Sequence, residues 1–186
     1  MMPRGVDDRT EQWEALYGEY GSRIYRFCHR LSGNPSDAED LTQEVFLAAF
    51  RGMEGFQGRS SIQTWLYRIA VFRWRALRRT DSPLLSNEGC AEPSAPDPAI
   101  AQTDKMSMDG AMASLPSIFR EAFLLVKLEG LTCREAAEAL GVPQGTVKFR
   151  IYRAVRLLRA RLQEDGWGTA SEQIAEEPGT EDCNAV

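Results

Sequence analysis

The chain has 186 residues, a formal net charge of −5 and a hydrophobic fraction of 43%. This length accommodates one globular domain or two small ones, and the apolar fraction is ordinary for a folded protein. There is no run of about 18 apolar residues and no apolar signal-peptide core, so we expect a cytoplasmic protein without direct membrane insertion.

The first part of the chain, from residue 13 to about residue 80, has the periodicity of helices. Its first helix carries one apolar stripe, formed by Trp13, Leu16, Tyr17, Tyr20, Ile24, Phe27 and Leu31. Gly33, Asn34 and Pro35 predict the end of this helix, because glycine and proline favour turns.

A second helix is predicted to run to about Arg51. Ser36 with Glu39 has the spacing of a capping box, which predicts that the helix opens there. The expected inward face consists of Leu41, Val45 and Ala48. Another face of the helix carries carboxylates spaced three and four residues apart, at Asp37, Asp40 and Glu44. This acidic stripe favours a basic partner.

A third helix is predicted from about Ser61 to Arg79, after a glycine-rich segment at 52–58. It interleaves arginines with aromatic residues: Arg68, Arg73, Arg75, Arg78 and Arg79 with Trp65, Tyr67, Phe72 and Trp74. Rings beside cations suit melted nucleic acid, in which bases stack on rings and phosphates meet guanidinium groups. The alternative is that Trp65, Ile69 and Phe72 are ordinary core residues.

Residues 83–113 have the composition of an exposed linker between two helical domains. Four prolines lie there together with serine, alanine and several acids: Pro83, Pro93, Pro96 and Pro98.

The segment after the linker predicts a helix-turn-helix. Thr132 and Glu135 form a capping box at the start of its first helix, in which Ala136, Ala137 and Leu140 face inward. Gly141 follows where a chain leaving a helix often needs positive φ, and Pro143 prevents continuation. The chain must therefore turn before a second helix.

This second helix combines a buried stripe with a basic surface. The stripe is Val147, Ile151, Val155, Leu158 and Leu162. Roughly opposite lie Thr146, Phe149, Arg153 and Arg156, flanked by Lys148, Arg150, Arg159 and Arg161, and no acid occurs before Glu164. Such a face neutralises phosphates, and its N-terminal residues can reach base edges. An ordinary solvated helix with arginine stems along its surface is the alternative.

The tail at 164–186 is acidic and contains no lysine or arginine, which predicts disorder. We favour a spacer role for it over competition with DNA for Arg153 and Arg156.

Cysteine and histidine usage gives no sign of a metal site or catalysis. Four cysteines, Cys28, Cys90, Cys133 and Cys183, share no metal-ligand spacing, and His29 is the only histidine. We predict reduced thiols, no cofactor, no metal and no catalytic residue, since no nucleophile and base pair or phosphate loop occurs. The neighbouring Cys28 and His29 leave a zinc or redox role as a minor alternative.

Three segments together resemble the extracytoplasmic-function (ECF) RNA polymerase sigma factor family. DAEDLTQEVFLAAFR (37–51) and FQGRSSIQTWLYRIA (56–70) resemble its region 2, and residues 115–162 resemble its region 4. The resemblance implies an all-α fold of two small helical domains joined by a flexible linker, the second a helix-turn-helix. We therefore expect region 2 at 1–82, a linker at 83–113, region 4 at 114–163 and the acidic tail at 164–186.

The resemblance also implies roles and partners. The partners would be core RNA polymerase, through its largest-subunit clamp coiled coil and its flap, promoter DNA, and an anti-sigma factor, which in this family is often membrane-bound. Polymerase docking would use Asp37, Asp40, Gln43 and Glu44. Melted minus-10 DNA would meet Arg59, Ser60, Ser61, Thr64, Trp65, Arg68, Arg73 and Arg75. Duplex minus-35 DNA would meet Thr146, Lys148, Phe149, Arg150, Arg153 and Arg156.

Three positions depart from the family pattern. Phe72 and Ala76 stand where relatives commonly have Asn and Asp, and Phe149 replaces a small polar residue. Phe149 could exchange a hydrogen bond for apolar contact with a thymine methyl group. The main alternative function is a regulator that binds duplex DNA alone, which leaves the acidic stripe and the arginine-aromatic helix unexplained.

Overall fold

The computed structural model describes residues 5–81 and 108–164, and all their regular elements are helical. The chain divides into two compact units, which confirms the predicted all-α, two-domain organisation. Residues 82–107 and 165–186 lie outside the described part, and with them most of the predicted linker and nearly all of the predicted tail.

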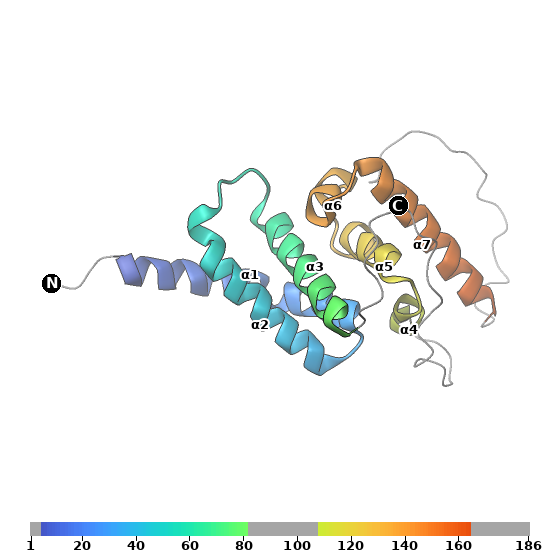
Figure 1. Ribbon diagram of the computed structural model, residues 1–186, viewed down its shortest axis with the longest axis horizontal. Helices are drawn as coiled ribbons and strands as arrows, with labels where there is room; N and C mark the ends of the chain where they lie inside the picture. Colours follow the sequence, from blue (N-terminus) through green and yellow to red (C-terminus); the bar gives the residue numbers. More distant parts are fainter. Residues whose placement is uncertain (1–4, 82–107, 165–186) are drawn as a thin grey trace. The chain divides into compact units, whose positions relative to one another are not determined.

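The first unit consists of α1 (Gly5–Ser32), α2 (Pro35–Gly52), the short 3-10 helix η1 (Met53–Gly55) and α3 (Ile62–Asp81), and its three α-helices pack together (Figure 1). Each α-helix contributes an apolar stripe to the core. The fully buried side chains include Ile24, Phe27, Leu31, Leu41, Val45, Leu66, Tyr67 and Val71. In the predicted α1 stripe, Tyr17 instead lies 54% exposed.

Helix α2 begins earlier than predicted, because Asn34 caps it in place of Ser36. The Asn34 side chain accepts a hydrogen bond from the Asp37 backbone N–H at 3.0 Å, and its amide donates to the Asp37 carboxylate at 2.7 Å. Pro35 occupies the start of the helix, where its fixed φ is favourable. The predicted capping box of Ser36 and Glu39 is therefore wrong: asparagine is an equally good cap and lies next to this proline.

The inward face of α3 is set by its smaller aliphatic residues and one tyrosine. Tyr67 is fully buried, and its ring lies edge-on to Phe27 with centroids 4.8 Å apart. Phe72 is 53% exposed, and Trp65 and Ile69 are half-buried. The aromatic pattern was ambiguous because rings occur on both sides of this helix, and the side that packs against Phe27 became the core.

The second unit consists of α4 (Met108–Ala113), α5 (Ser117–Phe123), the π-helical turn η3 (Leu124–Leu128), α6 (Cys133–Leu140) and α7 (Gln144–Glu164). Helix α7 packs against α4, α5 and α6 (Figure 1). Helix α4 occupies the last six residues of the predicted linker, and Ala111 and Met112 are buried in the core. The predicted linker was therefore too long at its C-terminal end, where Ala111 and Met112 belong to the core of the second unit.

The turn between α6 and α7 has the predicted geometry. Thr132 and Glu135 form the capping box: the Glu135 N–H donates to the Thr132 hydroxyl at 3.2 Å, and the Thr132 N–H donates to the Glu135 carboxylate at 2.9 Å. Gly141 ends α6 in the left-handed region with φ 68°. Its N–H donates to the Ala137 carbonyl at 2.9 Å. This turn fixes the angle at which α7 leaves α6.

Replacing Gly141 with alanine should destabilise the second unit by about 1 kcal/mol, because a side chain in the left-handed region is strained. The measurement is thermal or urea unfolding of the full chain. Gly145 is a matched control, since an added Cβ meets nothing within 4 Å at either glycine and only Gly141 has positive φ. Gly145→Ala should leave stability unchanged or slightly higher; equal losses in both variants would show that the left-handed turn is not the cause.

Candidate nucleic-acid interface

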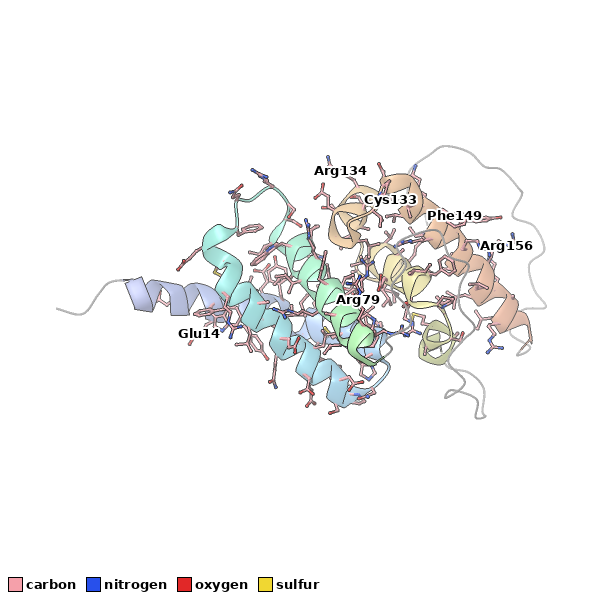
Figure 2. The ribbon with its side chains drawn as sticks, in the orientation of Figure 1. Glu14, Arg79, Cys133, Arg134, Phe149 and Arg156 are labelled. Atoms are coloured by element: carbon pink, nitrogen blue, oxygen red, sulfur yellow. The ribbon has the colours of Figure 1, made fainter. Side chains whose placement is uncertain are left out.

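The solvent face of α7 is cationic and carries two exposed aromatic rings. The core side of the helix is formed by Val147, Ile151, Ala154 and Leu158, all buried. On the exposed side, Phe149 and Tyr152 are each 58% exposed, and Lys148, Arg156 and Arg159 are exposed beside them. Figure 2 shows Phe149 and Arg156 on this helix. No acidic residue lies between Gln144 and Leu162.

The predicted minus-35 residues divide into two groups. Lys148, Phe149 and Arg156 are exposed, whereas Thr146, Arg150 and Arg153 are half-buried. The Nη1 atom of Arg150 is buried, so at least part of this guanidinium group faces the protein. Arg150 is therefore better suited to positioning α7 than to meeting a ligand.

Tyr152 is a further exposed residue of this face that was not predicted as a site residue. Its ring lies 5.8 Å from the Arg156 guanidinium carbon, a cation–π contact that holds both groups on the exposed face. Its place on this face could have been predicted from the sequence, because Tyr152 lies three residues after Phe149 and four before Arg156.

The loop before α3 is held by a small hydrogen-bonded group at the helix start. The Ser61 hydroxyl accepts from the Thr64 backbone N–H at 3.1 Å and lies 2.8 Å from the Thr64 hydroxyl. Thr64 is only 2% exposed. Its place in the interior suits positioning of the loop, whereas Arg59 and Ser61 are exposed and Ser60 is half-buried.

Trp65 is placed by two residues that were not predicted as site residues, Phe56 and Gly52. Its ring packs against Phe56 with centroids 4.9 Å apart. A Cβ added to Gly52 would lie 3.2 Å from Trp65 Cζ2, so glycine permits this close approach. The half-buried indole is thus supported by the segment that leads into the loop.

The rest of α3 presents a cationic surface. Arg68, Arg73, Arg78 and Arg79 are exposed, Arg75 is half-buried, and no acid occurs between Ile62 and Arg79. The Arg68 guanidinium carbon lies 5.9 Å from the Phe72 ring centroid, and that of Arg78 lies 5.7 Å from the Trp74 ring. This surface combines phosphate-neutralising groups with flat apolar groups.

The predicted docking residues form an acidic face on α2. Asp37, Asp40 and Gln43 are exposed and Glu44 is half-buried. Beside this face, α1 and α2 border an open groove of about 630 Å³, whose lining includes Gly18, Gly21, Glu39 and Gln43. On the α1 side the groove is also lined by the larger side chains of Tyr17, Tyr25 and Arg26.

Cys28 is a free, fully buried thiol in the first unit. Burial raises its pKa to about 12, although a hydrogen bond with Thr42 opposes the shift. Among the described residues, no three side chains of metal-ligating type are grouped to hold an ion.

Of the other cysteines, Cys90 and Cys183 lie outside the described residues. Within residues 5–81 and 108–164, no helix has the length and apolarity needed to cross a membrane.

Two family models match the two helical units. Residues 16–82 match Sigma-70 region 2, and residues 105–158 match Sigma-70, region 4. Among curated proteins, the ECF RNA polymerase sigma factor SigF of Caulobacter vibrioides is 32% identical over 169 residues, covering 88% of this chain and 92% of that protein. SigE of Mycolicibacterium smegmatis is 36% identical, and the match covers 85% of this chain but only 64% of SigE.

Solved structures share the fold at lower sequence identity. The sigma factor RpoE in complex with the anti-sigma factor NepR from Bartonella quintana gives a TM-score of 0.65 at 24% identity, covering 82% of this chain and 98% of that one. CnrH in complex with the cytosolic domain of CnrY gives 0.62 at 21% identity, covering 84% and 90%.

The buried Cys28 thiol should resist alkylation in the folded protein. With a pKa of about 12, it stays protonated throughout the range from pH 7 to 9, and the thiolate is the reactive form. Iodoacetamide treatment followed by peptide mass mapping should leave Cys28 unmodified under native conditions and modify it in denaturant. Rapid native labelling of Cys28 would show that the α1–α2 core opens readily.

Proposed function

Because this chain belongs to the ECF RNA polymerase sigma factor family, whose members are non-enzymatic polymerase subunits, we propose that it binds core RNA polymerase and directs promoter-specific transcription initiation. The observation that carries the proposal is the segregation of charge among the helices. Helix α2 presents an acidic face, whereas the exposed faces of α3 and α7 carry arginines without intervening acids.

The acidic face of α2 is the proposed polymerase-docking surface. Asp40 and Gln43 are exposed on it, and Glu44 borders it. The partner would be the clamp coiled coil of the largest subunit, with basic side chains opposite these carboxylates. Complementary charge steers encounter and disfavours wrong partners. The second domain would contact the polymerase flap.

Helix α3 and its preceding loop are the proposed site for the melted minus-10 element. Arg59, Ser60 and Ser61 would contact unpaired bases, with Thr64 holding the loop and Trp65 supporting it. Arg68, Arg73 and Arg75 would meet phosphates of the same strand. Capturing bases from an opened duplex costs unstacking energy, which contacts in the loop would offset.

Helix α7 is the proposed reader of the minus-35 duplex. The exposed side chains Lys148, Phe149 and Arg156 are the leading contacts, with Thr146 and Arg153 at the edge of the face and Tyr152 added by its exposure. A helix of a helix-turn-helix presents such residues to the major groove. Arg150 would act mainly by positioning the helix.

Control by an anti-sigma factor is part of the proposal. Two structures with this fold were determined as complexes, RpoE with the anti-sigma factor NepR and CnrH with the cytosolic domain of CnrY. A regulator that binds only duplex DNA would use α7 alone. The acidic face of α2 and the cationic face of α3 favour the sigma factor over that alternative.

Reversing Asp40 and Glu44 to lysine should weaken binding to core polymerase by at least about 100-fold, because like charges facing each other across an interface cost several kcal/mol. The affinity is measured by fluorescence anisotropy of the labelled full chain titrated with core enzyme, and circular dichroism checks that the helices remain.

A control variant reverses Glu11 and Glu14, which are exposed on α1 outside the proposed docking face, and thus makes the same net-charge change. It should bind core polymerase nearly as the wild type does. Retained binding by the Asp40 and Glu44 variant would move the docking surface away from α2.

Arg156→Ala should lower the salt slope of minus-35 duplex binding by about one, the signature of one lost phosphate contact. Arg150→Ala should instead lower the unfolding temperature, because it removes a side chain that is partly packed into the protein. Both are measured on the full chain, by duplex titration at several salt concentrations and by thermal unfolding. An unchanged slope in Arg156→Ala would remove Arg156 from the DNA contacts.

A further inference from the structure

Phe72 is a large aromatic residue of α3 that lies outside the core of its unit. More than half of its surface, 53%, is exposed, whereas Tyr67 on the inner side of the same helix is fully buried. A single exposed apolar side chain is common on protein surfaces and carries no signal by itself. The evidence that Phe72 binds a ligand comes from the residues around it.

The Phe72 ring contacts Arg68 on its N-terminal side, whereas its neighbour on the C-terminal side, Ala76, is too small to cover it. Helical side chains lean toward the N-terminus, which brings this ring toward Arg68, whose guanidinium carbon lies 5.9 Å from the ring centroid. One turn toward the C-terminus stands Ala76, whose side chain ends at Cβ and cannot cover the ring. The contact with Arg68 limits the freedom of the ring before any ligand arrives.

The charge around Phe72 selects the class of ligand. Residues 68, 72, 76 and 79 follow one another at helical spacing, and Arg68 and Arg79 at the ends of this row are exposed. Figure 2 shows Arg79 on α3. Since no acid occurs between Ile62 and Arg79, the surface favours a polyanion that offers flat apolar groups. Nucleic acid with unstacked bases is such a ligand, whereas the bases of an intact duplex are stacked on each other.

We propose that Phe72 is a stacking site for one unpaired base of melted promoter DNA, with Arg68 holding the ring and Arg79 neutralising a nearby phosphate. This inference rests on the proposed function and adds to it a second point of strand capture. Phe72 lies roughly 15 Å along α3 from Ile62, beyond reach of the loop at the helix start. Because a phenyl ring has no hydrogen-bonding group, the site strengthens capture and selects little by base identity.

The test uses holoenzyme assembled from the full chain and core polymerase. Its probe is a fluorescent promoter fork, a minus-35 duplex that continues into a single-stranded minus-10 segment. Phe72→Ala should weaken fork binding by on the order of tenfold, the range found for loss of one aromatic–base stack, while Phe72→Tyr keeps a ring and stays close to the wild type. Leu77→Ala is the control, because Leu77 is an exposed apolar residue of the same helix.

A scan of abasic sites distinguishes stacking from a structural effect. One abasic nucleotide is placed in turn at each position of the single-stranded segment. At the position that stacks on Phe72, wild type and Phe72→Ala should bind equally well, since the partner base is already missing. At other positions the difference should persist, and binding to a fully duplex minus-35 fragment should be the same for both.

Two outcomes would overturn the proposal while leaving the proposed function intact: equal fork affinity of wild type and Phe72→Ala, or a deficit that no abasic position removes. The second result would point to a protein contact or to a folding defect. If wild-type holoenzyme failed to bind the fork at all, both the stacking site and the proposed function would be rejected.

Discussion

The burial of one apolar stripe per helix is the constraint on which the other features of this protein depend. In the first unit, Phe27, Leu41 and Tyr67 lie in the core. Once these stripes are buried, the rotation of each helix is fixed, and so is the set of side chains that faces solvent. The acidic face of α2 and the cationic faces of α3 and α7 are consequences of this packing.

Because the rotation of each helix is fixed, the charged side chains of α2, α3 and α7 form separate surfaces. The surface on α2 is acidic, and those on α3 and α7 are cationic. A net charge of −5 is unexpected for a protein proposed to bind DNA, but no acid lies between Ile62 and Arg79 on α3 or between Gln144 and Leu162 on α7, and the carboxylates of α2 form a face of their own. Long-range attraction to phosphate can therefore act through α3 and α7, while α2 remains available to a basic partner. Aromatic rings held by arginines, at Phe72 and Tyr152, add apolar contact to both cationic faces.

The sequence predicts the fold well where a local signal has one structural solution. The Thr132 capping box and the left-handed Gly141 are such signals, and both were confirmed. It predicts less well where two solutions compete: Asn34 caps α2 in place of Ser36, and Tyr67 faces the core while Phe72 does not. Such choices depend on neighbouring helices. For the same reason the sequence predicts that α7 is a cationic helix. It does not predict that Arg150 is partly buried or that Tyr152 is exposed.

The most direct test of the central claim is transcription in vitro with purified core polymerase and a promoter library, with and without this protein. We predict new start sites that appear only with the protein and share a pair of upstream elements at a constant separation, one for α7 and one for the loop and surface of α3. A protein that binds duplex DNA but yields no new start sites with core polymerase would contradict the account and favour a regulator acting through α7 alone.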